Sequence, residues 1–590
     1  MNEHRQRKPV LTRRGPLPEY VAATKGSAVY QAHTYPTKIP PQAIVPFIEA
    51  STQVGAVVAD PFAGSGMTGV AALLSGRSAV LSDLSPGAVH LARNHTRRVE
   101  PQRLRDAVAD FDRRWMLQVE RDLYQTTIAP DISGLARHTI WSETYPCPAC
   151  REPVVLWDVS EPDAPLPREI ACPRCGTWFD RTSVRPAGSR AVYVVVKPDR
   201  GGKLVGSPPA EETLARLDQI RRRRVRHWVP NTSVEAHREM YIRSALHLRG
   251  IRSVADFFTT RPKLVLSQLW HEIGAVEDAH VREALRFAFT NTAWHSSRMR
   301  RFNAKGGQRP LTGTLFIPQL VSEPNVCEVF RSQVKQICRY YQQLPVGDGQ
   351  VDVRCGSATN LGWLMDGSVD YVFTDPPFGA NLFYADCNIV WESWLGDVTD
   401  HDAEIVVNRS RSVAQGGKTV ADYQRLLTGA FKEARRVLNP TGRCSVVFHS
   451  SDDAVWTALL DAVEAAGLHH AEVSILDKGQ RSQKGYKFRH GELVPFYDLV
   501  MTFTPVRGGL PHLNGAGEVA LDIVTDHLTR LNGSDAPARR GLDYLYSVAL
   551  SGIIQSGGRP TGLSLRAFEQ LCNSKLDRVG DRYYLPSGRL

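Results

Sequence analysis

The chain lacks an apolar run long enough to span a bilayer, and its N-terminal segment does not have the pattern of a signal peptide. Cysteine is scarce, with 10 in 590 residues, and four of the ten stand in two CxxC pairs. Paired CxxC motifs in a chain without a secretory signal favour a metal site over disulfides. These absences predict an intracellular, cytoplasmic protein without a membrane partner. A hydrophobic content of 42% is enough for large cores in several domains.

Acidic residues are in the minority: 61 acids stand against 72 Lys and Arg, for a net charge of +11 and a pI of about 9.2. Such a balance suits a polyanionic partner, because cationic side chains displace counterions from phosphates, although ordinary basic solubility gives the same balance. Three clusters are prominent: Arg221 to Arg226; Arg298, Arg300, Arg301 and Lys305; and Lys478, Lys484, Lys487 and Arg489. The first is equally typical of a solvated helix end. The other two favour nucleic-acid contact, and the third is interleaved with Tyr486 and Phe488.

The CxxC pairs are Cys147 with Cys150 and Cys172 with Cys175, and 21 residues separate them. Two such knuckles offer four thiolates in a tetrahedron, which predicts one zinc ion. No coordination position is left open, so the ion should be structural. Two alternatives are four unrelated thiols and a nucleophilic Cys147 after Pro146, as in cytosine C5 methyltransferases. The place of Cys147 in the first knuckle argues against the second.

A first chemical motif follows the apolar run 54–58: Asp60-Pro61-Phe62-Ala63-Gly64-Ser65-Gly66. Glycines let the backbone pass close to a ligand. The run predicts a buried strand, and Thr68 begins a helix. The next strand, 78–81, leads to Asp83, whose carboxylate can accept hydrogen bonds from ribose hydroxyls. Ser85 and Pro86 then suit the N-cap and first position of another helix.

The first motif also has a rival interpretation. Gly64 to Gly69 matches the G-x-G-x-x-G dinucleotide fingerprint, with Asp83 as its ribose acid. A dinucleotide site, however, gives no role to a second motif, Asp375-Pro376-Pro377-Phe378, which follows the strand-like run 369–373. A purely structural glycine turn, or a surface Asp-Pro-Pro turn, leaves the pairing of the two motifs unexplained as well.

The second motif suits methylation of an exocyclic amine. Prolines stiffen the loop and remove backbone donors, so its carbonyls stay free to accept. An Asp carboxylate and a loop carbonyl that accept from the amine N–H groups favour a more nucleophilic nitrogen. Phe378 would stack on the base, which in duplex DNA must first be flipped out.

Together the motifs resemble the S-adenosylmethionine-dependent amino-methyltransferase superfamily, whose usual DNA targets are adenine N6 and cytosine N4. The segments 33–41 and 436–448 also resemble this superfamily. The segments 255–261, 298–303 and 384–395 resemble, more closely, bacterial adenine-specific DNA methylases that contain a zinc ribbon. The resemblance implies catalytic roles for Asp375, Pro376, Pro377 and Phe378. It implies cofactor contacts by Lys38, Pro40, Asp60, Phe62, Gly64, Gly66, Thr68, Asp83 and Asp375. No acid stands at 356–358, where the family places its contact to the cofactor adenine.

The resemblance implies an α/β fold, in which a doubly wound, Rossmann-like methyltransferase sheet is split by a large insertion. We expect a flexible basic arm over 1–27, the cofactor half over 28–100 and the catalytic half over 351–505. The insertion, 101–350, would hold the zinc ribbon at about 140–182 and a helical target-recognition region. Residues 506–590 would form a separate winged-helix-like module, with a helix over 565–571 capped by Ser564.

The expected function is DNA methylation on an amino group, with adenine N6 favoured because cytosine N4 enzymes more often have Ser before Pro-Pro. Alternatives are cytosine N4 methylation, tRNA guanine N2 methylation, and a zinc-ribbon nucleic-acid-binding protein without activity. The expected partner is double-stranded DNA in a bacterial cell. Restriction–modification and phage defence, with their partner subunits, are settings that this activity would fit.

Overall fold

The structure is a computed structural model that describes residues 15–586, except 25, 130–131, 162–163, 305–306, 346–348, 480–496, 507–515 and 532–536. Lys305, Lys484, Lys487 and Arg489 therefore lie outside the described residues. No helix of the described part is both long and apolar enough to cross a membrane.

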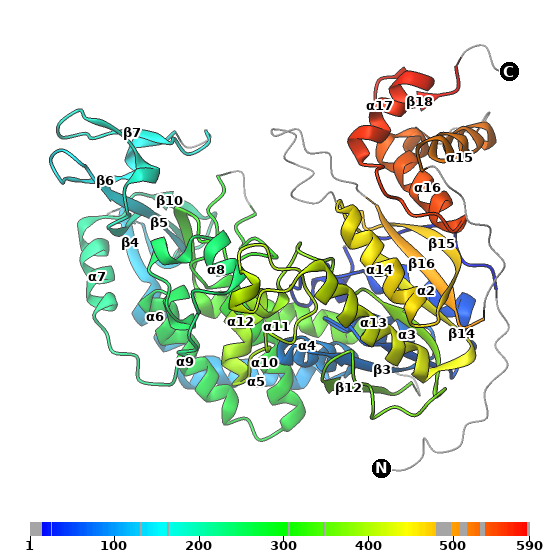
Figure 1. Cartoon of the computed structure of the whole chain (residues 1–590). Coiled ribbons are helices and arrows are strands. Elements are labelled where there is room, and N and C mark those ends of the chain that lie inside the picture. The colour runs from blue at the N-terminus through cyan, green and yellow to red at the C-terminus, as the bar shows by residue number, and fades with distance from the viewer. Residues whose placement is uncertain are drawn as a thin grey trace.

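The main sheet has eight strands, drawn from both ends of the chain (Figure 1). Their order across the sheet is β1-β15-β16-β14-β13-β2-β3-β12. The strands are β1 (Tyr20–Ala22), β2 (Val57–Asp60), β3 (Ser78–Asp83), β12 (Val351–Cys355), β13 (Val369–Thr374), β14 (Leu438–Phe448), β15 (His469–Asp477) and β16 (Asp498–Thr504). The predicted mixed α/β fold with a large sheet is confirmed.

The strand directions create a site at one edge of this sheet. β12, β3, β2, β13 and β14 run parallel to one another, and β16 is antiparallel to its neighbours β14 and β15. From β2 the chain steps outward through β3 to β12, and then returns to the other side of β2 as β13. Ligands of open α/β sheets bind at such a switch point, outside the carboxyl ends of the strands. Asp60 ends β2, and Asp375 directly follows β13.

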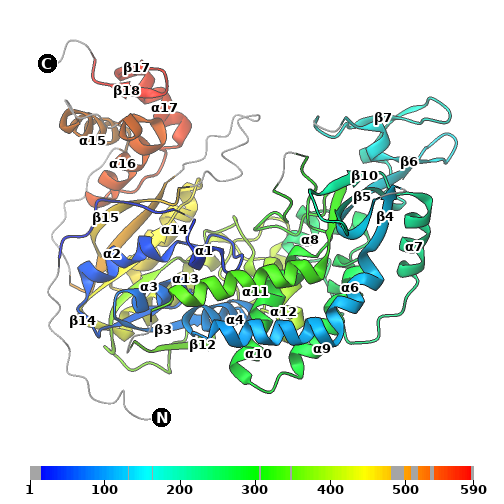
Figure 2. The same ribbon diagram turned by 180° about the vertical axis from the view of Figure 1, so that it is seen from behind.

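Side chains alternate between two faces of the sheet. Val58 and Tyr371 belong to one hydrophobic core, and Ala59 and Val372 belong to another. Helices cover both faces, as Figures 1 and 2 show from opposite sides. The first core contains side chains of α2 (Pro41–Ser51), α3 (Met67–Leu74) and α4 (Pro86–Thr96), and the second contains those of α13 (Val420–Val437) and α14 (Asp453–Ala465). Burial on both faces fits the near-continuous apolar character of these strands.

Between β3 and β12 the chain builds a second sheet and a group of helices. This sheet has the order β10-β9-β5-β11, and β4 and β6 also pair with the long β5. Its strands are β4 (Gln125–Ala129), β5 (Ile132–Pro146), β6 (Pro153–Val155), β9 (Gly188–Pro198), β10 (Val205–Ser207) and β11 (Leu320–Pro324). The helices are α5 (Pro101–Phe111), α6 (Leu117–Tyr124), α7 (Glu211–Arg221), α8 (Glu239–Arg243), α9 (Thr260–Gly274), α10 (Ala279–His295) and α11 (Val326–Gln343). α10 packs on α4 and on α12 (Tyr384–Leu395), which joins this region to the main sheet.

Two predictions about the chain ends need correction. Residues 20–22 are not part of a flexible arm: they form β1 parallel to β15, and Tyr20 donates a 2.9 Å hydrogen bond to Asp477. The C-terminal elements are not separate either, because their buried side chains share one core with the main sheet. They are α15 (Ala516–Arg530), α16 (Leu542–Gln555), α17 (Leu565–Lys575) and the hairpin of β17 (Asp577–Val579) and β18 (Arg582–Tyr584). α16 contacts β15, as the red end of the chain in Figure 1 shows.

Candidate active site and metal centre

A cavity lies at the carboxyl ends of β2, β3 and β13. It encloses about 900 Å³ of empty space, its open mouth included. Both sequence motifs line it, because its walls include Asp60, Gly64, Asp83, Asp375 and other residues of these loops. The walls also include Phe62, Thr68 and Pro377. The fold thus brings together two motifs that lie far apart in the sequence.

Asp60 fastens the two loops to each other. Its carboxylate accepts hydrogen bonds from Thr68 Oγ1 at 2.6 Å, Thr374 Oγ1 at 2.8 Å and the Phe62 backbone N–H at 3.0 Å. Thr374 is the last residue of β13. The buried Asp60 therefore holds the two loops in position relative to each other. Both of its carboxylate oxygens already have hydrogen-bond partners.

Asp83 shapes the glycine loop. One of its oxygens accepts from the Gly64 N–H at 2.7 Å, and the other accepts from the Ser85 N–H at 2.9 Å. A carboxylate has about four lone-pair sites, so capacity for a ligand hydroxyl remains. Ser85 caps α4 through the Ala88 N–H, with Pro86 at the first position, so that prediction is confirmed.

Gly64 and Gly66 have different surroundings. Gly64 lines the cavity with φ +49°, and a Cβ there would lie 3.0 Å from the Tyr35 ring. Gly66 has φ +81°, and a Cβ there would lie 2.6 Å from the Ala92 Cα of α4. Gly66 is therefore required where α3 packs on α4. A larger residue at Gly66 would therefore disturb the packing of α3 on α4 as well as the glycine loop.

The segment before α2 closes one side of the cavity. Tyr35 stacks on Tyr384 with ring centroids 6.0 Å apart, and Thr37 Oγ1 shares a 2.7 Å hydrogen bond with the Tyr384 hydroxyl. Lys38 lies in the wall, but its ammonium donates to the carbonyls of Val29, Tyr30 and His33. The ammonium also lies 3.3 Å from His95 Nε2, so its donors point into the protein. Burial lowers the pKa of Lys38 to about 7. Pro40 is buried and precedes α2. Both residues hold the segment in place.

Asp375 differs from Asp60 and Asp83 because one of its carboxyl oxygens has no hydrogen-bond partner among the described residues. This oxygen, Oδ1, is buried. Such an orphaned acceptor is costly unless a ligand completes it. Pro377 follows in the cavity wall, and its carbonyl already accepts from the Tyr423 hydroxyl at 2.6 Å.

Phe378 lies beside the cavity, outside its lining. Its half-buried ring meets Phe448 edge-to-face, with centroids 5.1 Å apart, and Phe448 in turn meets Trp456. Pro376 is buried. The remaining exposed part of the Phe378 ring is therefore what a base could contact.

Four carboxyl groups surround the cavity, and burial raises the pKa of each. The pKa values are about 6 for Asp60 and Asp83, about 7 for Asp375 and about 8 for Glu404. Hydrogen bonds to Asp60 and Asp83 oppose the effect of burial, as does the charge of Lys478 at Asp375. The cavity therefore favours a ligand that carries positive charge.

Some wall residues gave no local signal in the sequence. Glu404 is buried and accepts from the backbone N–H groups of Tyr384 and Ala385, at 2.5 and 3.3 Å, so it holds the start of α12. Lys478 forms an ion pair with Asp498, which also lies near His449. The sequence grouped Lys478 with surface cations, whereas the structure buries it near Asp375.

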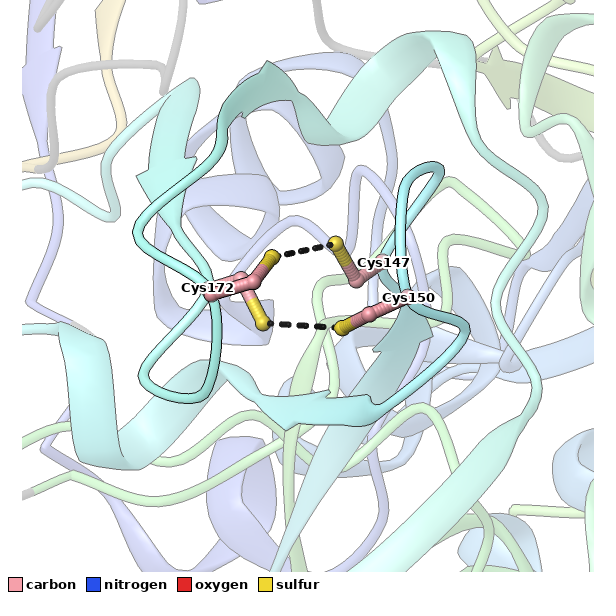
Figure 3. Close-up of side chains that lie close together, drawn as sticks. Cys147, Cys150 and Cys172 are labelled. Atoms are coloured by element: carbon pink, nitrogen blue, oxygen red, sulfur yellow. Dashed lines mark hydrogen bonds between the residues drawn. The ribbon is translucent and has the colours of Figure 1, made fainter.

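The four CxxC cysteines converge just after β5, and none of them lines the cavity. Figure 3 shows Cys147, Cys150 and Cys172 close together. Cys147 lies 3.7 Å from Cys175, and Cys150 lies 3.6 Å from Cys172, measured between sulfurs. A tetrahedron with Zn–S bonds of about 2.3 Å has edges of about 3.8 Å. The N–H groups of Arg151 and Gly176 donate to the carbonyls of Cys147 and Cys172, so the two knuckles share one geometry. β7 (Glu169–Ala171) and β8 (Trp178–Asp180) flank the second knuckle. The donor set fits zinc.

The described arginines of the second basic cluster differ in exposure. Arg301 is exposed. Arg298 is half-buried and donates to the carbonyls of Asp256 and Arg249, and Arg300 donates to that of His295. Burial lowers the pKa of Arg300 to about 10. Of these three, Arg301 is the exposed one, while the other two brace the loop.

Residues 12–94 match a methyltransferase family model, N6_N4_Mtase, which is described as DNA methylase. The matched segment is similar to that DNA methylase model, and it contains Asp60, Gly64, Gly66 and Asp83. The predicted resemblance is confirmed at this level. A search of curated proteins finds no match.

Similar solved structures include a candidate DNA modification methylase from Thermus thermophilus, with 12% identity and a TM-score of 0.16. Another is a 16S rRNA adenine methyltransferase mutant from Catenulisporales acidiphilia, with 14% identity and a TM-score of 0.14. The matches cover 29% and 27% of this chain, and 61% and 62% of those chains. This chain thus spans less than two thirds of either protein, and TM-scores this low do not establish a common fold.

Proposed function

We propose that the chain is an S-adenosylmethionine-dependent DNA methyltransferase that methylates an exocyclic amino group of a flipped base, adenine N6 ahead of cytosine N4. One observation carries the proposal: the glycine loop with Asp83 and the Asp375 loop line a single cavity at the switch point of a doubly wound sheet. The DNA methylase family of residues 12–94 agrees with it.

The cavity suits this cofactor, which supplies a methyl group on a positively charged sulfonium. Asp83 retains lone pairs for ribose hydroxyls beside Gly64, where the backbone can approach the ligand. The four carboxyl groups favour the cationic donor. Ser357 and Ala358 line the end where the family has an acid, so this chain would hold the adenine ring without that contact.

The orphaned Asp375 Oδ1 would accept a hydrogen bond from the target amine. That bond would orient the nitrogen lone pair, and the Asp375 carboxylate would take up the proton that the nitrogen loses. S-adenosylmethionine, when bound, would supply the methyl group and leave as the neutral thioether. The exposed part of Phe378 would stack on the flipped base, which is worth about 1–3 kcal/mol. The four cysteines would hold one structural zinc.

The test incubates the full chain with methyl-labelled cofactor and separate DNA and RNA pools, and identifies the labelled nucleoside by mass spectrometry. We expect N6-methyladenine from DNA. Asp375→Ala should bind the cofactor nearly as before and lose at least two orders of magnitude in turnover, about 3 kcal/mol of transition-state stabilisation. Asp526→Ala, a surface change on α15, is the control. Label in RNA, or parental turnover by Asp375→Ala, would overturn the proposal.

A further inference from the structure

Three potential metal ligands meet outside both sites described above. They are Glu235 and His237, in the turn before α8, and His401, in the loop after α12. Their ligand atoms all lie within 4.8 Å of one another. The His237 Nε2 atom lies 3.0 Å from Glu235 Oε2 and 3.1 Å from His401 Nε2.

Hydrogen bonds among Glu235, His237 and His401 cannot satisfy all three side chains at once. An imidazole Nε2 carries either one proton or one lone pair. If His237 Nε2 carries a proton and donates it to Glu235, that nitrogen has no second proton to donate to His401 and no lone pair to accept one from it. If His401 donates to His237, the carboxylate of Glu235 faces an acceptor. A cation resolves the conflict, because it accepts one lone pair from each of the three atoms.

The spacing also suits a metal ion. With metal–nitrogen bonds of about 2.0–2.1 Å, donor atoms lie about 2.9 Å apart in an octahedron and about 3.4 Å apart in a tetrahedron. The two spacings at His237 fall between these values. Two imidazoles and a carboxylate form a ligand set used for zinc, with the remaining positions left for water.

We propose that Glu235, His237 and His401 bind a divalent transition-metal ion, zinc being the expected one, independently of the four-cysteine site. The side chains are 45%, 40% and 21% exposed, so the ion would exchange with solvent and be removed by mild chelation. Nearby cations do not block the site. Arg411 donates to Asp402 at 2.8 Å, and Lys418 donates to the His401 carbonyl at 3.1 Å.

The location gives the ion a role. Thr399, Ala403 and Glu404, on either side of His401, line the candidate active site. The ion would therefore fasten the 235–238 turn to the loop that forms one wall of the cavity. Its loss should loosen that wall without removing any group placed in the proposed chemistry.

Zinc content of the full chain is measured by mass spectrometry after dialysis against a range of free zinc, for the parent, His237→Ala, His401→Ala and the exposed control His280→Ala. Each of the first two should bind one zinc fewer than the parent, and His280→Ala should match the parent. Glu235→Gln should weaken this site at least tenfold.

Cobalt separates the two sites by spectrum. Cobalt bound by thiolates shows sulfur-to-metal charge-transfer bands, whereas cobalt bound by His237 and His401 does not. His237→Ala and His401→Ala should therefore lose the cobalt ion that shows no charge-transfer bands, and keep the thiolate-bound cobalt ion that shows them. Circular dichroism checks that the variants remain folded, as the exposure of these side chains leads us to expect. Equal metal uptake and equal cobalt spectra in parent and variants would overturn the proposal.

Discussion

At the scale of single residues, the ionisation of Asp375 controls the proposed reaction. Burial raises its pKa to about 7, and only the ionised carboxylate can take up the proton that the amine loses. We expect kcat/KM to rise with pH through about 7 and then level off. The charge of Lys478 opposes the rise in pKa, so Lys478→Met should shift the midpoint to higher pH. Lys432→Met, an exposed change on α13, should leave it unmoved. A parental profile that is flat between pH 6 and 8 would contradict this assignment.

The same carboxyl group affects stability. Its folded-state pKa, about 7, lies above the ordinary 3.8. The proton that Asp375 keeps on folding therefore adds stability that is full below about pH 4 and lost as pH rises through about 7. Asp375→Asn cannot ionise, so its Tm should exceed the parental Tm at pH 8, and the difference should shrink toward pH 4. Thermal melts over this range check the sign, and a lower variant Tm at pH 8 would refute it.

Alanine substitutions at Gly64 and Gly66 should have different effects on cofactor affinity and on stability. Gly64→Ala places a Cβ against the Tyr35 ring at the cavity and also strains a positive φ. We therefore expect cofactor affinity to fall at least tenfold, with a smaller loss of stability than at Gly66. Gly66→Ala drives a Cβ into the backbone of α4 and strains a positive φ, so we expect a loss of stability of about 1–3 kcal/mol. Gly274→Ala, with open space around it, is the control. Calorimetric cofactor titration and melting curves separate the two effects.

At the scale of elements, we expect the CxxC hairpins to depend on a bound metal ion for their stability. Their own core is small, consisting of Tyr145, Val154, Leu156, Ile170, Phe179 and two of the cysteines. Such a core cannot hold the fold alone, so a filled metal site supplies folding free energy. Cys172→Ser should lose one zinc and expose residues 146–180 to protease, while cofactor affinity stays unchanged. Cys355→Ser, outside the cluster, should keep its zinc. Protease resistance of the Cys172→Ser hairpins would contradict this.

The elements also show what sequence can predict. The strand at 369–373, the Ser85 cap and the helix that starts after Ser564 were all predictable, because apolar runs and capping chemistry are local signals. The pairing of β1 with β15 and the burial of Lys478 were not, because each depends on residues far away in the sequence. Both loops that line the cavity could be located from their motifs. Glu404, whose partners are backbone N–H groups of another element, could not.

At the scale of the whole molecule, shared cores and buried polar contacts join the parts. Tyr20, Tyr497 and Tyr544 pack together, so the N-terminal strand, the main sheet and α16 meet in one cluster. The inserted segment is fastened to α12 by Arg238, whose guanidinium lies 3.0 Å from the Asp386 carboxylate. Both side chains are about 5% exposed or less. The second Asp386 oxygen accepts from the Met240 N–H at 2.9 Å.

This buried ion pair should determine how firmly the inserted region is attached to the catalytic half. Arg238→Ala leaves the Asp386 charge buried without its partner, which typically costs about 3–5 kcal/mol. We therefore expect faster hydrogen exchange in residues 235–243 and 384–395 and a lower Tm. The double variant Arg238→Met, Asp386→Asn removes both charges and keeps the side-chain volume, so it should recover much of the loss. Arg425→Ala, which breaks the exposed pair with Asp422 on α13, should change little, because surface pairs contribute about 0–1 kcal/mol. If Arg238→Ala and Arg425→Ala were equally mild, the attachment would rest on the apolar packing of α10 against α12 instead.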